Sequence, residues 1–223
     1  MMRVAIGKGQ MVMRTSRVIL SLIVALLMTG CSFKLFSPQE YKTYVLSAVE
    51  TGKDLESKSE TGSGEHTGEH GTTVLIVTDT VSPSYLAGQK LLFREGAREL
   101  LAYQYSAWAE APPRQITRAL ERRLASRNKF KAVVRPSTGV RADIQLNTAL
   151  LDFFHDAQKR PGVGVMSVEA ELVSLNNGAV IAKQTFVKRV PVEEFEAAGA
   201  VVALDAATTA IISEITTWVE QAS

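Results

Sequence analysis

An apolar run with a positively charged head restricts what the first thirty residues of this chain can become. Arg14 and Arg17 precede residues 18–28, which are apolar apart from Ser21. This order, followed by small residues, is typical of a secretory signal peptide. A run of 11 residues is well short of the roughly 18 to 20 that cross a bilayer as a helix, so it does not predict a permanent membrane span.

The run ends in Leu27-Met28-Thr29-Gly30-Cys31, which contains the only cysteine of the chain. A cysteine directly after two small residues resembles the bacterial lipobox, although Met28 stands where lipoboxes usually carry leucine. The resemblance implies that residues 1–30 are removed as a lipoprotein signal peptide. Cys31 would then carry a diacylglyceryl group, with a further acyl chain such as palmitate on the freed amine. The alternative is an ordinary signal peptide whose Cys31 stays unmodified.

Lipid attachment would make the processed protein a membrane-anchored one. Acyl chains contribute about 0.8 kcal/mol per buried CH₂, so two or three long chains hold a protein on a membrane. In the system that sorts such lipoproteins between the two membranes, it is mainly an aspartate directly after the cysteine that retains a lipoprotein at the inner membrane. Ser32 occupies that position, which implies the periplasmic face of the outer membrane. Residues 31–40, with Pro38, are expected to form a short tether.

Composition limits what the processed chain can be. Because 46% of the residues are hydrophobic and 22% are charged, residues 41–223 can bury the core of one ordinary domain. The sequence has 25 basic and 23 acidic residues, but four of the basic ones lie in the leader, so the processed chain is slightly acidic. That argues against a nucleic-acid-binding protein, which needs a basic surface. With Cys31 modified, no thiol remains for disulfide, metal or redox chemistry.

A polar insert interrupts the predicted domain at about residues 50–72, where Leu55 is the only large apolar residue. Such a stretch cannot bury enough surface to offset the entropy of ordering, so we expect it to be disordered. Within it, His66 and His70 are spaced as metal ligands on one face of a helix would be. Gly64, Gly68 and Gly71 oppose that helix, and a solvated loop is the favoured interpretation.

The rest of the chain predicts several strands. Apolar runs and period-two alternation favour strands at residues 41–49, 74–77, 90–93, 101–105, 130–134, 144–150, 165–175 and 180–190. Beyond Leu150 the alternation changes phase, which predicts a β-bulge near residues 149–151. Asn176-Asn177-Gly178 predicts a tight hairpin turn, because Asn-Gly tolerates positive φ angles.

Two segments predict helices. The first begins at Pro112-Pro113 and runs through Arg127, since proline suits the first helical turn. Its charged residues Arg118, Arg122 and Arg123 are expected to form a solvated face rather than a binding patch. The second is expected from about residue 192 to 219, directly after Pro191, with one apolar stripe. These elements predict an α+β fold with an antiparallel or mixed β-sheet and two main helices packed on one face.

Motifs for chemistry are scarce. The sequence lacks G-x-x-x-x-G-K-[ST], G-x-S-x-G and H-E-x-x-H. His155, between Asp152 and Asp156, forms the one acid–histidine cluster near an expected strand. Without a serine elbow or a thiol to activate, it is interpreted as a strand-end histidine in a polar turn. Trp108 could anchor a partner or fill the core between a strand and a helix. We expect no catalytic, cofactor or metal site.

The order of motifs resembles a known family. Tyr41-Lys42-Thr43-Tyr44-Val45-Leu46, the run at 74–77, and Tyr103-Gln104-Tyr105-Ser106-Ala107-Trp108-Ala109-Glu110 before the helix at Pro113 are similar to the ABC-type transport auxiliary lipoproteins. This family includes the PqiC-like outer-membrane lipoproteins. Two features depart from it: Ala107 stands where members often carry arginine, and the insert is unusually long.

The resemblance implies a non-catalytic, anchored component of an envelope transport system for lipids or other hydrophobic molecules. Its partners would be an MCE-domain periplasmic protein and an ABC transporter permease/ATPase complex. Some members assemble into rings, so a homo-oligomer stays open, with the strand carrying Glu169 and Glu171 as a candidate contact. The alternatives are a structural envelope lipoprotein or outer-membrane assembly factor, and a lipoprotein enzyme that uses His155 or the pair His66 and His70.

Overall fold

The computed structural model describes residues 40–49 and 71–223, and Glu40–Ser223 form one compact unit. The predicted signal peptide, Cys31, the tether up to residue 39 and the insert with His66 and His70 lie outside the described residues. The strands are β1 (Lys42–Tyr44), β2 (Val74–Val77), β3 (Lys90–Arg94), β4 (Leu101–Trp108), β5 (Ala132–Val134), β6 (Ile144–Asp156), β7 (Val163–Ser174) and β8 (Val180–Pro191). The helices are α2 (Pro112–Ala125) and α3 (Ala197–Ala222), with 3-10 turns η1 (Ser47–Val49) and η3 (Pro136–Thr138).

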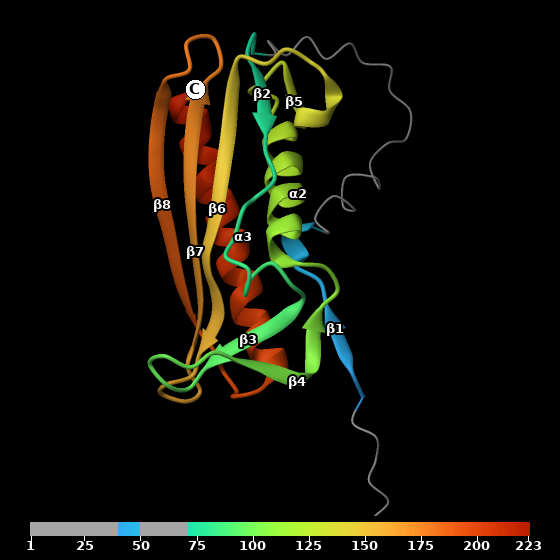
Figure 1. The fold of residues 1–223 in the computed structure, drawn as a ribbon, viewed down its shortest axis with the longest axis vertical. Helices are drawn as coiled ribbons and strands as arrows, with labels where there is room; N and C mark the ends of the chain where they lie inside the picture. Colours follow the sequence, from blue (N-terminus) through green and yellow to red (C-terminus); the bar gives the residue numbers. More distant parts are fainter. Residues whose placement is uncertain (1–39, 50–70) are drawn as a thin grey trace, which may run out of the picture. The chain divides into compact units, whose positions relative to one another are not determined.

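These strands form one mixed sheet in which β6 has three neighbours (Figure 1). β7 pairs antiparallel with β6 along one edge, and β8 pairs antiparallel with β7. The other edge of β6 is divided, because β2 pairs in parallel with residues 144–146 and β3 pairs in parallel with residues 155–156. β5 extends the sheet beyond β2, and β4 and β1 extend it beyond β3. The predicted α+β fold is confirmed, with a mixed sheet.

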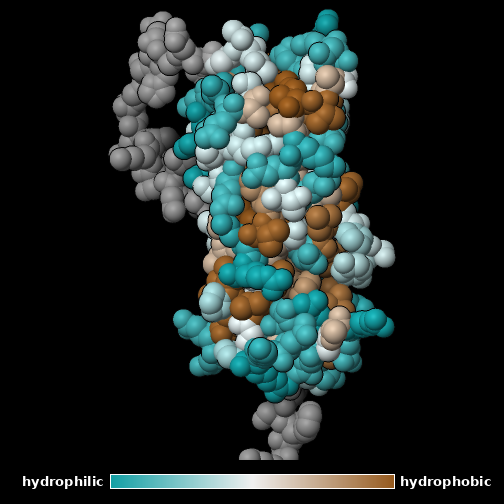
Figure 2. Space-filling model, turned by 90° about the vertical axis from the view of Figure 1, so that its left-hand side faces the viewer, coloured by the Kyte–Doolittle hydropathy of each residue, from teal (hydrophilic) through white to brown (hydrophobic). Residues whose placement is uncertain are grey.

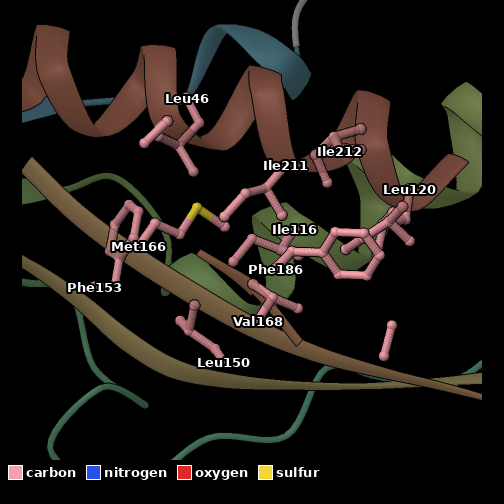
Figure 3. Close-up of a cluster of buried hydrophobic side chains, with 14 of the residues drawn as sticks. Leu46, Ile116, Leu120, Leu150, Phe153, Met166, Val168, Phe186, Ile211 and Ile212 are labelled. Atoms are coloured by element: carbon pink, nitrogen blue, oxygen red, sulfur yellow. The ribbon is translucent and has the colours of Figure 1, made fainter. Parts of the chain in front are cut away.

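Both helices contribute to a single core. α2 begins with Pro112 and Pro113 in its first turn, where a missing N–H leaves no hydrogen bond unmade. α3 packs against β7, β8 and α2. The predicted apolar faces are buried, apart from Trp218, which is only partly buried. Figure 3 shows Ile116 of α2, Met166 of β7 and Ile211 of α3 in one cluster with Leu46, and all four are 0% exposed.

α3 is also the one helix of the described residues that is long and apolar enough to cross a membrane. Half of its most apolar stretch is buried inside the domain, because the apolar stripe of α3 packs on β7 and β8.

Two local predictions for the long strands are confirmed. β6 shifts register against β7 between Leu150 and Asp152, which is the expected bulge. It restores inward-facing apolar residues after the phase change, since Leu150 and Phe153 are 0% and 2% exposed. The β7–β8 hairpin turns at Gly178 with φ 72°, as Asn-Gly chemistry predicts.

Several predicted boundaries are wrong. β6 continues to Asp156 and β4 to Trp108, beyond the expected ends at 150 and 105, and α2 ends at Ala125 rather than Arg127. The last helix begins at Ala197 rather than 192, because the chain bends through residues 193–196 after β8 ends at Pro191. β1 covers only three residues of the expected strand 41–49, since the chain turns into η1 beside the helices. β5 is likewise shorter than residues 130–134. Such ends depend on contacts with distant parts of the chain as well as on the local pattern.

Candidate functional site

Of the predicted site residues, only His155 with its neighbours and Trp108 lie in the part of the chain that the structure describes. His155 is 0% exposed and faces the helices beside Gly164, its partner on β7. His155 is the penultimate residue of β6, so the prediction of a strand-end histidine is confirmed, but the predicted polar turn is wrong because the side chain is buried. The ring lies near two aromatic side chains, with centroid distances of 6.4 Å to Tyr103 and 5.6 Å to Phe195.

Both ring nitrogens of His155 have hydrogen-bond partners. Nε2 lies 2.7 Å from the carbonyl oxygen of Pro161, and a carbonyl can only accept, so Nε2 carries the proton. Nδ1 then accepts from the hydroxyl of Tyr103 at 2.8 Å. Burial lowers the pKa of His155, so the ring is neutral at pH 7. Burial, and then the charge of Glu95, raise the pKa of Tyr103 to about 12, which keeps its hydroxyl a donor.

The acidic neighbours of His155 do not join it in a catalytic arrangement. Asp156 follows it on β6, and consecutive side chains of a strand point to opposite faces. Asp156 accepts a hydrogen bond from Arg94 at 2.5 Å. Burial alone would raise the pKa of Asp156, but this bond and the charge of Arg94 hold it below its usual value. Asp152 pairs across the sheet with Ser167.

The arrangement around His155 therefore connects structural elements. It joins β4 through Tyr103, β6 through its own backbone, and the turn before β7 through Pro161. No serine or cysteine lies at hydrogen-bond distance of its ring among residues 40–49 and 71–223. Within the same residues, no group of three or more His, Cys, Asp or Glu side chains could hold a metal ion. Sequence reasoning missed Tyr103 and Pro161, since neither stands near His155 in a recognisable motif.

Trp108 is a core residue. It is 1% exposed, and its ring lies 5.4 Å from that of Phe153. The core interpretation is confirmed, and the alternative of a partner-binding anchor is wrong because a buried ring offers no surface.

The surface that carries β8 combines apolar and charged residues. Val180, Ile181 and Val187 are 56%, 41% and 52% exposed, and Figure 2 shows brown hydrophobic patches separated by hydrophilic ones on the side of β8. A shallow groove of about 350 Å³ lies between β8 and α3, where Trp218 meets Phe186 edge-on at 5.9 Å. On the opposite face of the sheet from this groove, Glu169 of β7 forms an ion pair with Lys183 of β8 at 2.8 Å.

The segment through which the chain enters the domain is bonded to both helices. The N–H of Leu46 donates to Gln115 of α2 at 2.9 Å. The N–H and the hydroxyl of Ser47 donate to the carboxylate of Asp205 on α3 at 2.7 and 2.6 Å. Leu46 itself is 0% exposed. Residues 40–49 thus belong to the domain, as predicted, and they are attached through buried Leu46 and the bonds of Leu46 and Ser47 to the two helices, which the sequence did not predict.

This geometry defines an α+β domain with two helices on one face of a mixed sheet, whose acid–histidine cluster is a structural connection. Residues 55–216 match the family model of the ABC-type transport auxiliary lipoprotein component, and the chain belongs to this family. The resemblance seen in the sequence is confirmed. The family description makes the chain an auxiliary lipoprotein of a transport system and points to a non-catalytic, membrane-associated protein. Among curated proteins, none matches the sequence.

Solved structures share the fold. A DUF330 protein of Xanthomonas campestris is 19% identical, with a TM-score of 0.65, and the alignment covers 74% of this chain and 93% of that one. An uncharacterized protein is 20% identical with a TM-score of 0.55, covering 66% and 92%. The PelC dodecamer of Paraburkholderia phytofirmans, at 12% identity and a TM-score of 0.38 over 64% and 87%, is too distant to carry an argument.

Proposed function

We propose that this protein is exported, processed before Cys31 and anchored by lipid to the periplasmic face of the outer membrane. There it serves as a non-catalytic auxiliary component of an ABC/MCE-type transport system for lipids or other hydrophobic molecules. Its partners are an MCE-domain periplasmic protein and the permease/ATPase complex, and ATP hydrolysis belongs to another subunit. The observation that carries the proposal is the family match over residues 55–216.

The described structure supports an adaptor held by a tether. The first described residue, Glu40, leads directly into β1, and the next residues are bonded to α2 and α3. A pull on an anchor at Cys31 would therefore act on the domain core rather than on a loosely attached arm. The nine Cα-to-Cα steps from Cys31 to Glu40 span at most about 30 Å, so the domain would stay close to its membrane.

The anchor is tested by mass spectrometry of the processed N-terminus. We expect a first residue at Cys31 that carries acyl chains, and loss of both acylation and membrane retention in Cys31→Ser. Ser32→Asp should move the protein to the inner membrane, while the matched variant Ser32→Ala should stay in the outer membrane. An intact leader with a free thiol would refute the proposal.

The transport role is tested by affinity purification from detergent-solubilised envelopes. Recovery of an MCE-domain protein or a permease/ATPase subunit with the wild type supports it. Recovery of outer-membrane proteins without any transport subunit would instead support the structural or assembly alternative. Substitution of His66, His70 and His155 should leave the transport phenotype intact in any variant that still folds, whereas its loss would favour the enzyme alternative.

A further inference from the structure

The positive charge of the domain is concentrated in one part of the chain. Residues 114–141 contain nine basic residues and a single acidic one, Glu121. The helix charges alone indicate no more than a solvated face. The structure adds that the basic residues continue around the C-terminal end of α2 into the segment before β5. This cationic end consists of Arg122, Arg123, Arg127, Lys129 and Lys131, and no acidic residue lies between Arg122 and Asp143.

Much of this charge is not neutralised within the domain. Arg127 forms an ion pair with Glu220 of α3 at 2.9 Å. Arg123, Lys129 and Lys131 are exposed and have no ion pair with any residue of 40–49 or 71–223. Lys183 and Lys188, by contrast, lie against Glu169 and Glu214. Lys42, Lys90 and Lys159 are also exposed and without an ion pair among the described residues, but they lie in three separate stretches of the chain. Arg123, Lys129 and Lys131 are therefore the three charges of the cationic end that can meet carboxylates from outside.

The cationic end is also hollowed and held in place. A depression of about 790 Å³ lies there; Lys129 and the ion pair of Arg127 with Glu220 line it, together with Asn128, Thr73 and Ser223. The N–H of Lys131 donates to the carbonyl of Thr73 at 2.9 Å. A Cβ on Gly71 would lie only 2.0 Å from the carbonyl oxygen of Lys129, so only glycine fits this close approach. Cations on a fixed backbone lose less freedom on binding than cations on a free loop.

We propose that the cationic end of α2 is the docking surface for an acidic segment of a protein partner. Charge complementarity selects the partner: the unpaired cations Arg123, Lys129 and Lys131 fit carboxylates, and Lys129 also lines the hollow. The inference relies on the proposed function only for the partner's identity, which would be a periplasmic subunit of the transport system. Complementary charges of this kind determine how fast two proteins associate and how their surfaces are aligned in the complex.

A bilayer is the less suitable ligand for this surface. Helices that lie on membranes combine basic residues with apolar ones that insert between lipids. The apolar face of α2 is already used, since Ile116, Leu120 and Leu124 are each 0% exposed. In the described chain, no exposed large hydrophobic side chain lies between residues 101 and 139.

The location of the cationic end in the domain also favours a protein partner over a bilayer. The N-terminal end of α2 is the one bonded to the segment through which the chain enters, by Gln115 and Leu46. From residue 115 to residue 125 the helix rises about 15 Å. The cationic end therefore lies at the end of α2 away from the chain entrance, near β2 and β5 (Figure 1). With an anchor at Cys31, that end is accessible to a partner reaching in from the periplasm.

The test compares the wild type, the triple variant Arg123→Gln, Lys129→Gln, Lys131→Gln, and a matched control, Lys42→Gln, Lys90→Gln, Lys159→Gln. The control residues are also exposed and have no ion pair within the described chain. The first measurement is binding of poly-L-glutamate, and the second is binding of phosphatidylglycerol vesicles, both with Cys31→Ser so that no lipid anchor contributes. We expect the triple variant to bind poly-L-glutamate about tenfold more weakly, as three exposed ion pairs allow, and the control to match the wild type.

The third measurement is recovery of transport subunits from solubilised envelopes. Recovery with the wild type and the control but not with the triple variant supports the inference. Equal recovery with all three overturns it and leaves the proposed function standing. If even the wild type recovers no transport subunit, the proposed function fails and the poly-L-glutamate result alone decides the inference.

Two further outcomes overturn the inference. In the first, the triple variant loses vesicle binding but keeps poly-L-glutamate binding, and the surface then belongs to the membrane. In the second, the wild type binds poly-L-glutamate only after the six acidic residues of the insert at 50–70 are changed to glutamine or asparagine. The occupant would then be the chain itself. Equal thermal unfolding of the three proteins checks that all are folded.

Discussion

The meander β6–β7–β8 and the N-terminal segment 40–49 are built in opposite ways. The meander is contiguous in sequence, its strands are 13, 12 and 12 residues long, and a tight turn joins β7 to β8. The N-terminal segment has a strand of three residues, and its side-chain and backbone contacts reach Gln115 and Asp205, 69 and 158 residues further along. The structure of the meander is determined mainly by residues close together in the sequence, whereas that of the N-terminal segment depends on contacts with distant residues.

Because of this difference, the loss of one contact should have different consequences in the two regions. In the meander, a lost contact is surrounded by other contacts of the same strands. In the segment, one buried leucine and a few hydrogen bonds hold the part of the domain nearest to the proposed anchor. Loss of one of them should detach the segment rather than loosen it.

The largest expected effect is that of Leu46→Ala. Leu46 and Leu172 of β7 are both 0% exposed, and replacing a fully buried leucine by alanine costs about 2 to 5 kcal/mol. We expect Leu46→Ala and Leu172→Ala each to lower the free energy of unfolding by that amount in urea titrations. Val45→Ala is the matched control, since Val45 is 45% exposed and should change little. A Leu46→Ala loss below about 1 kcal/mol would mean that the segment is not part of the cooperative unit.

His155 tests the connection between the meander and β4. Its pKa is lowered by burial in the folded protein, so the unfolded chain binds the proton more readily. Stability is then complete above the unfolded pKa of about 6.5 and falls as the pH drops below it, by up to about 1.4 kcal/mol per pH unit. The free energy of unfolding should decline between pH 7 and 5.5 in the wild type and less steeply in His155→Gln. Parallel pH profiles would show that His155 is not the group responsible.

The smallest expected effect lies in the hairpin turn of the meander. Gly178 has φ 72°, a conformation that costs an L-residue about 1 kcal/mol. Gly178→Ala should therefore lower the free energy of unfolding by about that amount, and Gly178→Asn by less, because asparagine visits this region more readily. Gly88→Ala is the control, since a Cβ there meets nothing within 4 Å and φ is not positive. Equal effects of all three substitutions would contradict the assignment of strain to φ.

The same contrast explains how far the sequence could predict the structure. The bulge in β6, the turn at Gly178 and the start of α2 were predictable because each depends on residues within a few positions. The division of one edge of β6 between β2 and β3 was not, since no local pattern records which strands meet. The burial of His155 escaped prediction for the same reason, because its partners Tyr103 and Pro161 come from separate elements. Cys31 was proposed from its motif, and the structure describes no part of the chain around it.

The two tryptophans of the chain provide a spectroscopic means of telling core from surface events. Trp108 is 1% exposed, so its fluorescence should be blue-shifted and resistant to acrylamide. Trp218, partly buried at the groove beside β8, should emit at longer wavelength and be quenched readily. A ligand or subunit that covers the groove would protect only the second emitter, whereas opening of the sheet would expose the first. Wild-type protein therefore carries its own pair of optical reporters and needs no attached dye.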